Sequence, residues 1–195
     1  SGITVMARRH TIVRKPVAVE TLGSVTVVAT DKTGTLTYGE MMVEKAWVNR
    51  KVFDFSGAGY DQHGDIFLGE KKILSQEHPD LNRLLRLGVL NNDARFGWQS
   101  DNQRLPIGDP TELALLVAAE KGGWSKIDLD SAHPRIGEFP FDYKKKYMVT
   151  WHRDEQRTLV VVKGAPHEVL QLCRQRLHEG VAIGLAAGLL QRLVD

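Results

Sequence analysis

Residues 146–164 read KYMVTWHRDEQRTLVVVKG, and the class of fold follows from this stretch. Two runs rich in β-branched and aromatic residues, 146–153 and 157–164, are separated by the polar residues DEQ. Such side chains favour strands, and a short polar link between two such runs is typical of a β-hairpin. The sequence therefore predicts an antiparallel sheet in this part of the chain.

Helical patterns lie on both sides of this hairpin. Apolar side chains recur at helical spacing in residues 78–93, at Leu81, Leu84, Leu85 and Val89. Residues 110–122 and 166–177 each begin with a proline, which suits the first position of a helix. Further strands are predicted over residues 41–48, 51–57 and 94–100. The pattern predicts an α+β fold, with an antiparallel sheet flanked by helices.

The composition excludes several classes of protein. With 42% hydrophobic and 26% charged residues, the 195-residue chain is typical of a globular protein. Its net charge of +2 produces no field that would attract nucleic acid, so no nucleic-acid partner is expected. The single cysteine, Cys173, excludes an internal disulfide and suits a reducing, cytosolic setting. The longest weakly polar run, residues 181–190, is about half of the ~20 residues that span a bilayer.

The strongest candidate for chemistry is DKTGTLT, residues 31–37, which follows the apolar run SVTVVAT at 24–30. The apolar run predicts a strand, and ligands of α/β sheets gather where strands end. A carboxylate such as Asp31 can act there as a base, a metal ligand or a nucleophile. Lys32 and the nearby hydroxyls suit an anionic phosphoryl group, although Asp, Thr and Gly also make ordinary turns.

The heptapeptide DKTGTLT resembles the phosphorylation signature of the P-type ATPases, cation pumps that form an aspartyl-phosphate. The resemblance implies that Asp31 attacks the γ-phosphate of ATP beside Lys32, and that Mg²⁺ is held by Asp31 and the backbone carbonyl of Thr33. Haloacid dehalogenase-like phosphatases share the strand and loop but carry a second acid where this chain has Thr33. Because threonine does not titrate near neutrality, prompt hydrolysis of the aspartyl-phosphate is not expected.

Two further motifs resemble the nucleotide-binding domain of these pumps. GDPTELALL, residues 108–116, is similar to the helix whose acid faces the adenine amino group, which implies this role for Glu112. A capping box with Asp109 as the N-cap is the structural alternative. FPFDYKKKYM, residues 139–148, resembles the strand pair that carries an adenine-stacking phenylalanine and a nearby lysine. The matching residues are Phe141 and Lys146, and the alternative for Phe141 is a core position beside Phe139.

KGAP, residues 163–166, resembles a nucleotide-site motif of the same family and implies that Lys163 and Gly164 lie at the nucleotide. A turn leading into a helix explains the glycine and the proline of this motif, but not the lysine. Two positions depart from the family pattern: Tyr143 replaces an arginine of many calcium-pump-like members, and His167 replaces an acid.

The resemblance implies two domains. Residues 1–39 match the N-terminal piece, one strand and a loop, of an incomplete haloacid dehalogenase-like α/β phosphorylation domain, and residues 40–195 match a nucleotide-binding domain truncated at its C-terminus. The implied partners are ATP and the rest of the same pump: the remaining phosphorylation domain, the actuator domain and the transmembrane helices. The parent is expected to be a multi-pass protein of the cell membrane, with these domains on its cytoplasmic side.

We expect the chain alone to bind ATP without turning it over, because the other parts of the catalytic site have no match in the sequence. A soluble haloacid dehalogenase-like phosphatase and a non-catalytic nucleotide-binding module are the alternatives. The basic segment before residue 24 and GAGYDQHGD at 57–65 resemble the calcium-pump-like subgroup, which also transports other cations.

Overall fold

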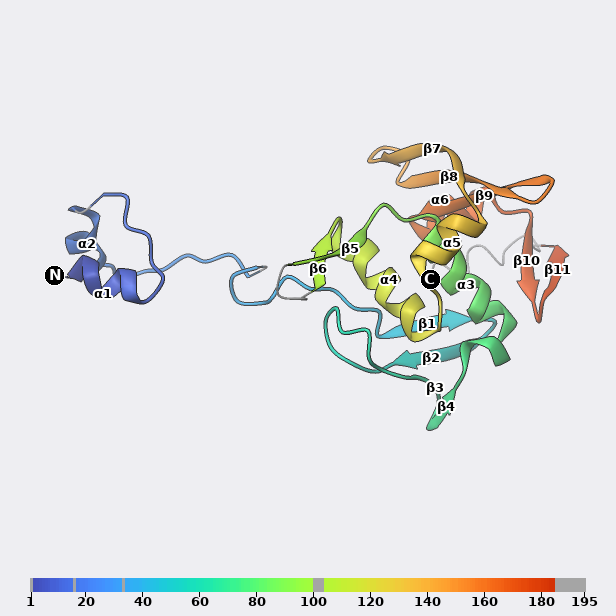
Figure 1. Ribbon diagram of the computed structural model, residues 1–195, viewed down its shortest axis with the longest axis horizontal. Coiled ribbons are helices and arrows are strands. Elements are labelled where there is room, and N and C mark those ends of the chain that lie inside the picture. The colour runs from blue at the N-terminus through green and yellow to red at the C-terminus, as the bar shows by residue number, and fades with distance from the viewer. Residues whose placement is uncertain (1, 16, 33, 100–103, 185–195) are drawn as a thin grey trace. The chain divides into compact units, whose positions relative to one another are not determined.

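The computed structural model describes residues 2–15, 17–32, 34–99 and 104–184. The chain forms two compact units, Ser1–Gly39 and Glu40–Asp195 (Figure 1).

The first unit contains two short helices, α1 (Gly2–Arg8) and α2 (Val17–Leu22). The strand predicted over residues 24–30 is not formed: Ser24 lies in a turn, and residues 25–30 have no regular structure. The side chains of Val27 and Val28 are 80% and 81% exposed. A strand is stabilised by hydrogen bonds to neighbouring strands, and no described segment of this unit pairs with these residues.

The second unit is built on antiparallel pairs. The four-stranded sheet has the order β1 (Lys45–Val48), β2 (Lys51–Phe55), β3 (Ile66–Leu68), β4 (Lys71–Ile73). The three-stranded sheet consists of β7 (Arg135–Asp142), β8 (Tyr147–Asp154) and β9 (Arg157–Gly164), with β9 at one edge. Two-stranded ribbons are formed by β5 (Arg95–Trp98) with β6 (Arg104–Ile107), and by β10 (Gln175–His178) with β11 (Val181–Gly184). The predicted hairpin is confirmed as β8 and β9.

Helix α3 (Pro79–Leu90) lies between the two larger sheets, since it contacts both β1 and β9 (Figure 1). The other helical segments described in this unit are the 3₁₀ turn η1 (Ser75–Glu77), α4 (Pro110–Lys121), α5 (Lys126–Ala132) and α6 (Pro166–Leu172). α3 contacts α4, α5, β1 and β9, so it lies at the centre of the core. Its buried side chains include Leu81, Leu85 and Val89, as the periodicity predicts, whereas Leu84 is 46% exposed and does not belong to the core.

The helix predicted over residues 166–177 is too long. α6 ends at Leu172, and residues 175–178 form β10 instead. β10 pairs with β11 across a turn in which Glu179 and Gly180 both have positive φ, the geometry of a two-residue hairpin. Pairing with β11 therefore overrides the helix propensity of this segment.

The described residues of the second unit confirm an α+β fold with antiparallel sheets and helices. Within the part of the chain that the structure describes, no helix is long and apolar enough to cross a bilayer.

Candidate functional site

Four segments of the second unit surround a cavity of about 680 Å³. They are the turn after α3, the first turn of α4, the hairpin between β7 and β8, and the end of β9. The five residues predicted for a nucleotide site all line it: Glu112, Phe141, Lys146, Lys163 and Gly164. A larger cavity of about 780 Å³ lies among β1, α3, β9 and α6, but its lining is predominantly apolar. Binding sites combine apolar surface with a few convergent polar groups, so the smaller cavity is the better candidate.

Glu112 is positioned by the start of α4. Asp109 caps this helix, since its carboxylate accepts a hydrogen bond of 2.8 Å from the backbone N–H of Thr111. Glu112 does not return a bond to the cap, so the predicted capping box is incomplete. Instead, one oxygen of Glu112 accepts from the backbone N–H of Asp93 at 3.0 Å, and the other accepts from the ammonium group of Lys163 at 2.6 Å. The carboxylate is thus directed into the cavity.

The pair between Lys163 and Glu112 joins two elements that are 51 residues apart in the chain. The side chains are only 26% and 13% exposed, so solvent screens their attraction less than it would a surface pair. Lys163 lies near the end of β9, opposite Met148 in the register of the sheet. The pair places one positive and one negative group side by side on the cavity wall.

Gly164 is required by the packing of the backbone. A Cβ atom at this position would lie 2.3 Å from the carbonyl oxygen of Lys146 and 2.4 Å from the Cβ of Tyr147. The same carbonyl accepts a hydrogen bond from the backbone N–H of Ala165 at 2.8 Å. The glycine therefore allows the end of β9 to approach the start of β8, which fixes Lys146 relative to Lys163.

Phe141 presents an exposed aromatic face at the rim of the cavity. It is 48% exposed, which excludes the alternative of a core aromatic. The ring of Tyr143 meets it edge to face, with centroids 5.3 Å apart. Asp142 stabilises the turn between β7 and β8, because its carboxylate accepts hydrogen bonds from the backbone N–H groups of Lys145 and Lys144. These two hydrogen bonds lower the pKa of the Asp142 carboxyl group.

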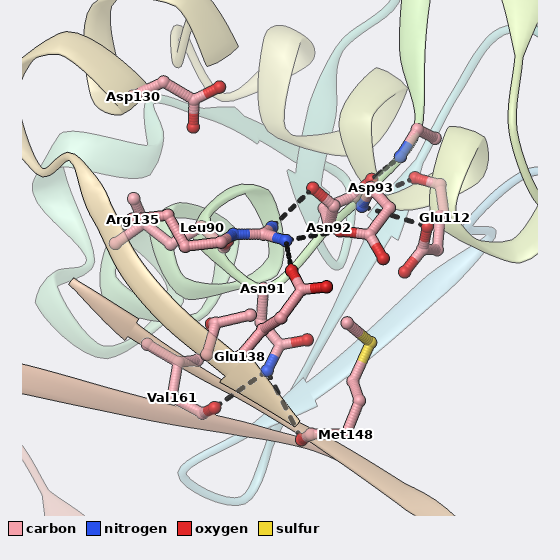
Figure 2. A network of polar contacts seen from close by, with 12 residues as sticks. Leu90, Asn91, Asn92, Asp93, Glu112, Asp130, Arg135, Glu138, Met148 and Val161 are labelled. Atoms are coloured by element: carbon pink, nitrogen blue, oxygen red, sulfur yellow. Dashed lines mark hydrogen bonds and ion pairs between the residues drawn. The ribbon is translucent and has the colours of Figure 1, made fainter. Parts of the chain in front are cut away.

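A polar network supports the wall of the cavity that carries Asp93 (Figure 2). The guanidinium group of Arg135 donates to the carboxylates of Asp93 and Glu138 and to the carbonyls of Leu90 and Asn92. Burial by itself lowers the pKa of Arg135, but the two carboxylates raise it more, so the net shift is upward.

Two asparagines at the end of α3 tie the same turn to its neighbours. Asn91, which is fully buried, donates to the carbonyl of Val161 at 2.8 Å. Asn92, also fully buried, donates to the backbone carbonyl of Glu112 at 2.8 Å and accepts from the backbone N–H of Ala94 at 2.9 Å. The two asparagines thus link the turn after α3 to β9 and to the first turn of α4.

The loop at 31–37 belongs to the first unit, and the hydrogen bonds of its described residues are local. Asp31 and Lys32 are exposed, whereas Thr33 lies outside the described residues. The backbone N–H of Leu36 donates to the carbonyl of Lys32 at 2.9 Å, and the N–H of Gly34 donates to the hydroxyl of Thr37 at 3.3 Å. These bonds make the segment a turn.

The described residues do not form a complete metal site. They contain no group of three or more His, Cys, Asp or Glu side chains that could hold an ion. Asp31 offers one carboxylate, whereas Mg²⁺ prefers six oxygen ligands. The predicted magnesium site at Asp31 and Thr33 would therefore need ligands from outside this set.

Comparison with known proteins identifies the family. Residues 80–192, more than half of the chain, match the family described as "P-type ATPase, cytoplasmic domain N". The chain belongs to the P-type ATPases. The matched region contains all four segments that surround the cavity.

Individual P-type ATPases are similar over most of the chain. A calcium-transporting ATPase of Bacillus subtilis is 39% identical over 182 residues, which are 93% of this chain and 20% of that protein. The cation-transporting ATPase pma1 of Synechocystis is 38% identical, over 100% of this chain and 22% of that protein. A sodium/potassium-transporting ATPase subunit alpha-A of Artemia franciscana is 32% identical, over 92% of this chain and 18% of that protein. The chain thus spans about one fifth of the length of these relatives.

Sequence reasoning missed the supporting residues of this P-type ATPase domain, Asp93 and Arg135. The LNND segment at 90–93 lies at the end of the predicted helix 78–93 and gives no separate signal of a binding site. The link from Arg135 to this turn gives no local signal, because Leu90 and Asp93 lie more than 40 residues earlier in the sequence.

Proposed function

We propose that the 680 Å³ cavity binds ATP, with the adenine ring between the face of Phe141 and the carboxylate of Glu112. The observation that carries the proposal is the convergence of three separate motifs, around Glu112, Phe141 and Lys163, on one cavity wall. Membership of the P-type ATPase family, whose domain N matches residues 80–192, supports it.

The chemistry of the wall suits an adenine. The half-exposed ring of Phe141 offers a face on which a base can stack, an interaction typically worth ~1–3 kcal/mol. Each carboxylate oxygen of Glu112 has a further lone pair, so it can also accept a hydrogen bond from the 6-amino group of adenine. Guanine carries a carbonyl at this position and would face the carboxylate with an acceptor. We therefore expect adenine nucleotides to be preferred.

The lysines of the site suit the ribose and phosphates. Lys146 and Lys163 line the cavity from two different strand ends, and the main-chain contact at Gly164 holds those ends together. Tyr143 stands where the resemblance expects an arginine, so the phosphate end has less positive charge than in many relatives. Weak binding of ATP by the chain alone follows from this arrangement.

A titration tests the binding proposal. ATP added to the ¹⁵N-labelled chain should shift the amide signals of Phe141, Lys146 and Lys163, and Phe141→Ala should weaken binding about tenfold through lost stacking. Trp98→Ala is the matched control, since Trp98 is a 66% exposed aromatic residue that does not line the cavity. Absence of shifts at millimolar ATP, or equal effects of the two substitutions, would refute the proposal.

For the parent protein we propose the P-type reaction. The Asp31 carboxylate attacks the γ-phosphorus of ATP, an aspartyl-phosphate forms, and the bond to the β–γ bridging oxygen breaks, so that ADP leaves with that electron pair. Lys32 lowers the cost of bringing the anionic phosphate to the loop. Mg²⁺ bound near Asp31 and Thr33 would neutralise phosphate charge. Hydrolysis of the aspartyl-phosphate then completes ATP turnover, which the parent couples to cation transport.

The two units correspond to two domains of the proposed pump. We propose that residues 1–39 are the first part of the phosphorylation domain and that residues 40–195 belong to the nucleotide-binding domain. The remaining phosphorylation domain, the actuator domain and the membrane helices would be the partners within one multi-pass pump, with this chain on the cytoplasmic side of the membrane. The strand expected before Asp31 would then form by pairing with further strands of the phosphorylation domain.

The chain by itself should bind ATP without turnover, because the described residues form no complete metal site around Asp31. Incubation with γ-labelled ATP and Mg²⁺ measures this directly. Stable label on Asp31, absent in Asp31→Asn, would contradict the expectation. Release of phosphate from p-nitrophenyl phosphate would favour a phosphatase instead.

A further inference from the structure

A single arginine outside the cavity holds together the wall that carries Glu112. Arg135 is the first residue of β7, and its side chain is 25% exposed. Its guanidinium group donates to the carbonyls of Leu90 and Asn92 at 3.2 and 2.9 Å, and to the carboxylates of Asp93 and Glu138 (Figure 2). Guanidinium is the side-chain group that can serve several acceptors at once from one rigid plane.

The turn held by Arg135 is also the turn that holds Glu112. Asp93 donates its backbone N–H to the Glu112 carboxylate at 3.0 Å, and the side-chain amide of Asn92 donates to the Glu112 carbonyl at 2.8 Å. Both the side chain and the backbone of Glu112 are thus fixed by two successive residues. Arg135 contacts both of those residues but does not line the cavity.

We propose that Arg135 is a positioning residue of the nucleotide site: by fixing the turn at residues 91–94, it aims the Glu112 carboxylate at the exocyclic amino group of a bound adenine. The effect of Arg135 on nucleotide binding rests on the function proposed above. Arg135 would therefore determine how strongly adenine is distinguished from bases without that amino group, rather than how tightly every triphosphate binds.

The alternative role for Arg135 is general support of the fold. A merely structural role predicts that its loss weakens all ligands equally or lowers stability alone. A positioning role predicts a selective effect. Lys146 and Lys163 lie outside β7, and Phe141 lies at the far end of β7 from Arg135. Among the described residues, the hydrogen bonds and ion pairs of Arg135 involve none of these three side chains. Selectivity between two triphosphates therefore separates the two roles.

The first measurement does not depend on any nucleotide. In Arg135→Gln, the amide of Asp93 should exchange with solvent about tenfold faster than in the unmodified chain, because its bond to Glu112 is no longer held. The amide of Ala46 in β1 should be unchanged. The matched control is Arg153→Gln, an exposed arginine on the neighbouring strand β8. Unchanged exchange at Asp93, or equally faster exchange throughout the second unit, would overturn the positioning role.

The second measurement compares ATP with purine riboside triphosphate, which lacks the 6-amino group. Arg135→Gln should weaken the binding of ATP about fivefold and the binding of the analogue less than twofold, since only ATP loses a hydrogen bond to the misplaced Glu112 carboxylate. Arg135→Lys, which keeps the charge but cannot reach all four acceptors, should give an intermediate ATP affinity. Equal weakening of both triphosphates would refute the proposal.

Failure of the two proposals can be told apart. If the unmodified chain binds neither triphosphate, both the proposed function and the role of Arg135 in adenine recognition are refuted. The exchange rate at Asp93 then still shows whether Arg135 fixes the turn that holds Glu112.

Discussion

The phosphorylation-like loop at 31–37 and the cavity around Glu112 differ in how they are held. The loop carries the most specific motif of the sequence, yet its hydrogen bonds join residues no more than four positions apart, and Asp31 is exposed. The cavity is built from weaker motifs, but its wall is joined by bonds between residues 19 to 51 positions apart. The comparison teaches that the strength of a motif and the structural order of a site are separate properties. A nucleophile can be specified locally, whereas recognition of a base requires tertiary structure.

The largest expected effect comes from the core of the second unit. Leu81 is fully buried in α3, so Leu81→Ala should lower the free energy of unfolding by about 2–5 kcal/mol. Val28→Ala, at an 81% exposed position of the first unit, should change it by less than about 0.5 kcal/mol. Urea denaturation followed by circular dichroism and tryptophan fluorescence measures both. A cost above 1 kcal/mol for Val28→Ala would mean that the first unit belongs to the same cooperative core.

A smaller effect is expected at the junction of β8 and β9. Gly164→Ala places a Cβ 2.3 Å from the carbonyl oxygen of Lys146, so it should cost about 1–3 kcal/mol of stability and weaken ATP binding. Gly184→Ala is the matched control, because nothing lies within 4 Å of a Cβ at that position. Similar stability and ATP affinity in the two variants would show that the strand ends move apart without consequence.

Substitution of one lysine in the cavity and one in the loop at 31–37 tests which of the two regions contributes to ATP affinity. Lys163→Met should weaken ATP about tenfold, since it removes a charged donor and leaves the 13% exposed Glu112 without its cation. Lys32→Met should leave the affinity of this chain unchanged within about twofold, because an exposed, screened charge outside the binding cavity contributes little. Calorimetric titration at fixed ionic strength provides the comparison. A marked loss in Lys32→Met would show that the loop contributes to binding.

The smallest effect is a dependence on pH. Burial lowers the pKa of His152 below its ordinary value of 6.5, while the carbonyl of His133 opposes the shift and the charge of Arg135 adds to it. The folded state therefore favours neutral His152. Its contribution to stability is complete above about pH 6.5 and is lost as pH falls toward the folded-state pKa.

Denaturation of the unmodified chain and of His152→Gln between pH 7.5 and 5 checks this sign. The His152→Gln variant should have a lower free energy of unfolding than the unmodified chain at pH 7.5. This difference in free energy should become smaller as the pH falls. His63→Gln, at a side chain that is 83% exposed, serves as the control and should follow the unmodified chain. A difference that widens at low pH would contradict the assignment.

Local patterns predicted the parts of the fold that depend on local interactions. The periodicity of α3, the proline at the start of α4 and the β-branched and aromatic runs of β8 and β9 each identify their element. The end of α6 could not be predicted in this way, because residues 175–178 take strand structure from pairing with β11. The strand expected at 24–30 fails for the same reason, since it has no described partner.

The candidate site shows the same limit. Five of its lining residues were predicted from motifs, and the structure brings all five to one cavity. The partners of Glu112 were not predicted: a capping box was considered only as the alternative to a nucleotide contact, whereas the Glu112 oxygens accept from Asp93 and Lys163. Both partners arrive through tertiary packing, from the end of α3 and from β9. Only the packed structure reveals Arg135, which contacts the lining residue Asp93 without lining the cavity itself.

The edge position of β9 has a practical consequence for anyone handling the protein. Residues 158–162, TLVVV, carry no charge, and among the strands that the structure describes β9 pairs only with β8. An uncharged edge strand is a template for a strand of another molecule, so solubility should be limited by this edge rather than by the net charge of +2. Val160 is 50% exposed and lies outside the Glu112 cavity, so Val160→Lys is the substitution of choice for concentrated samples.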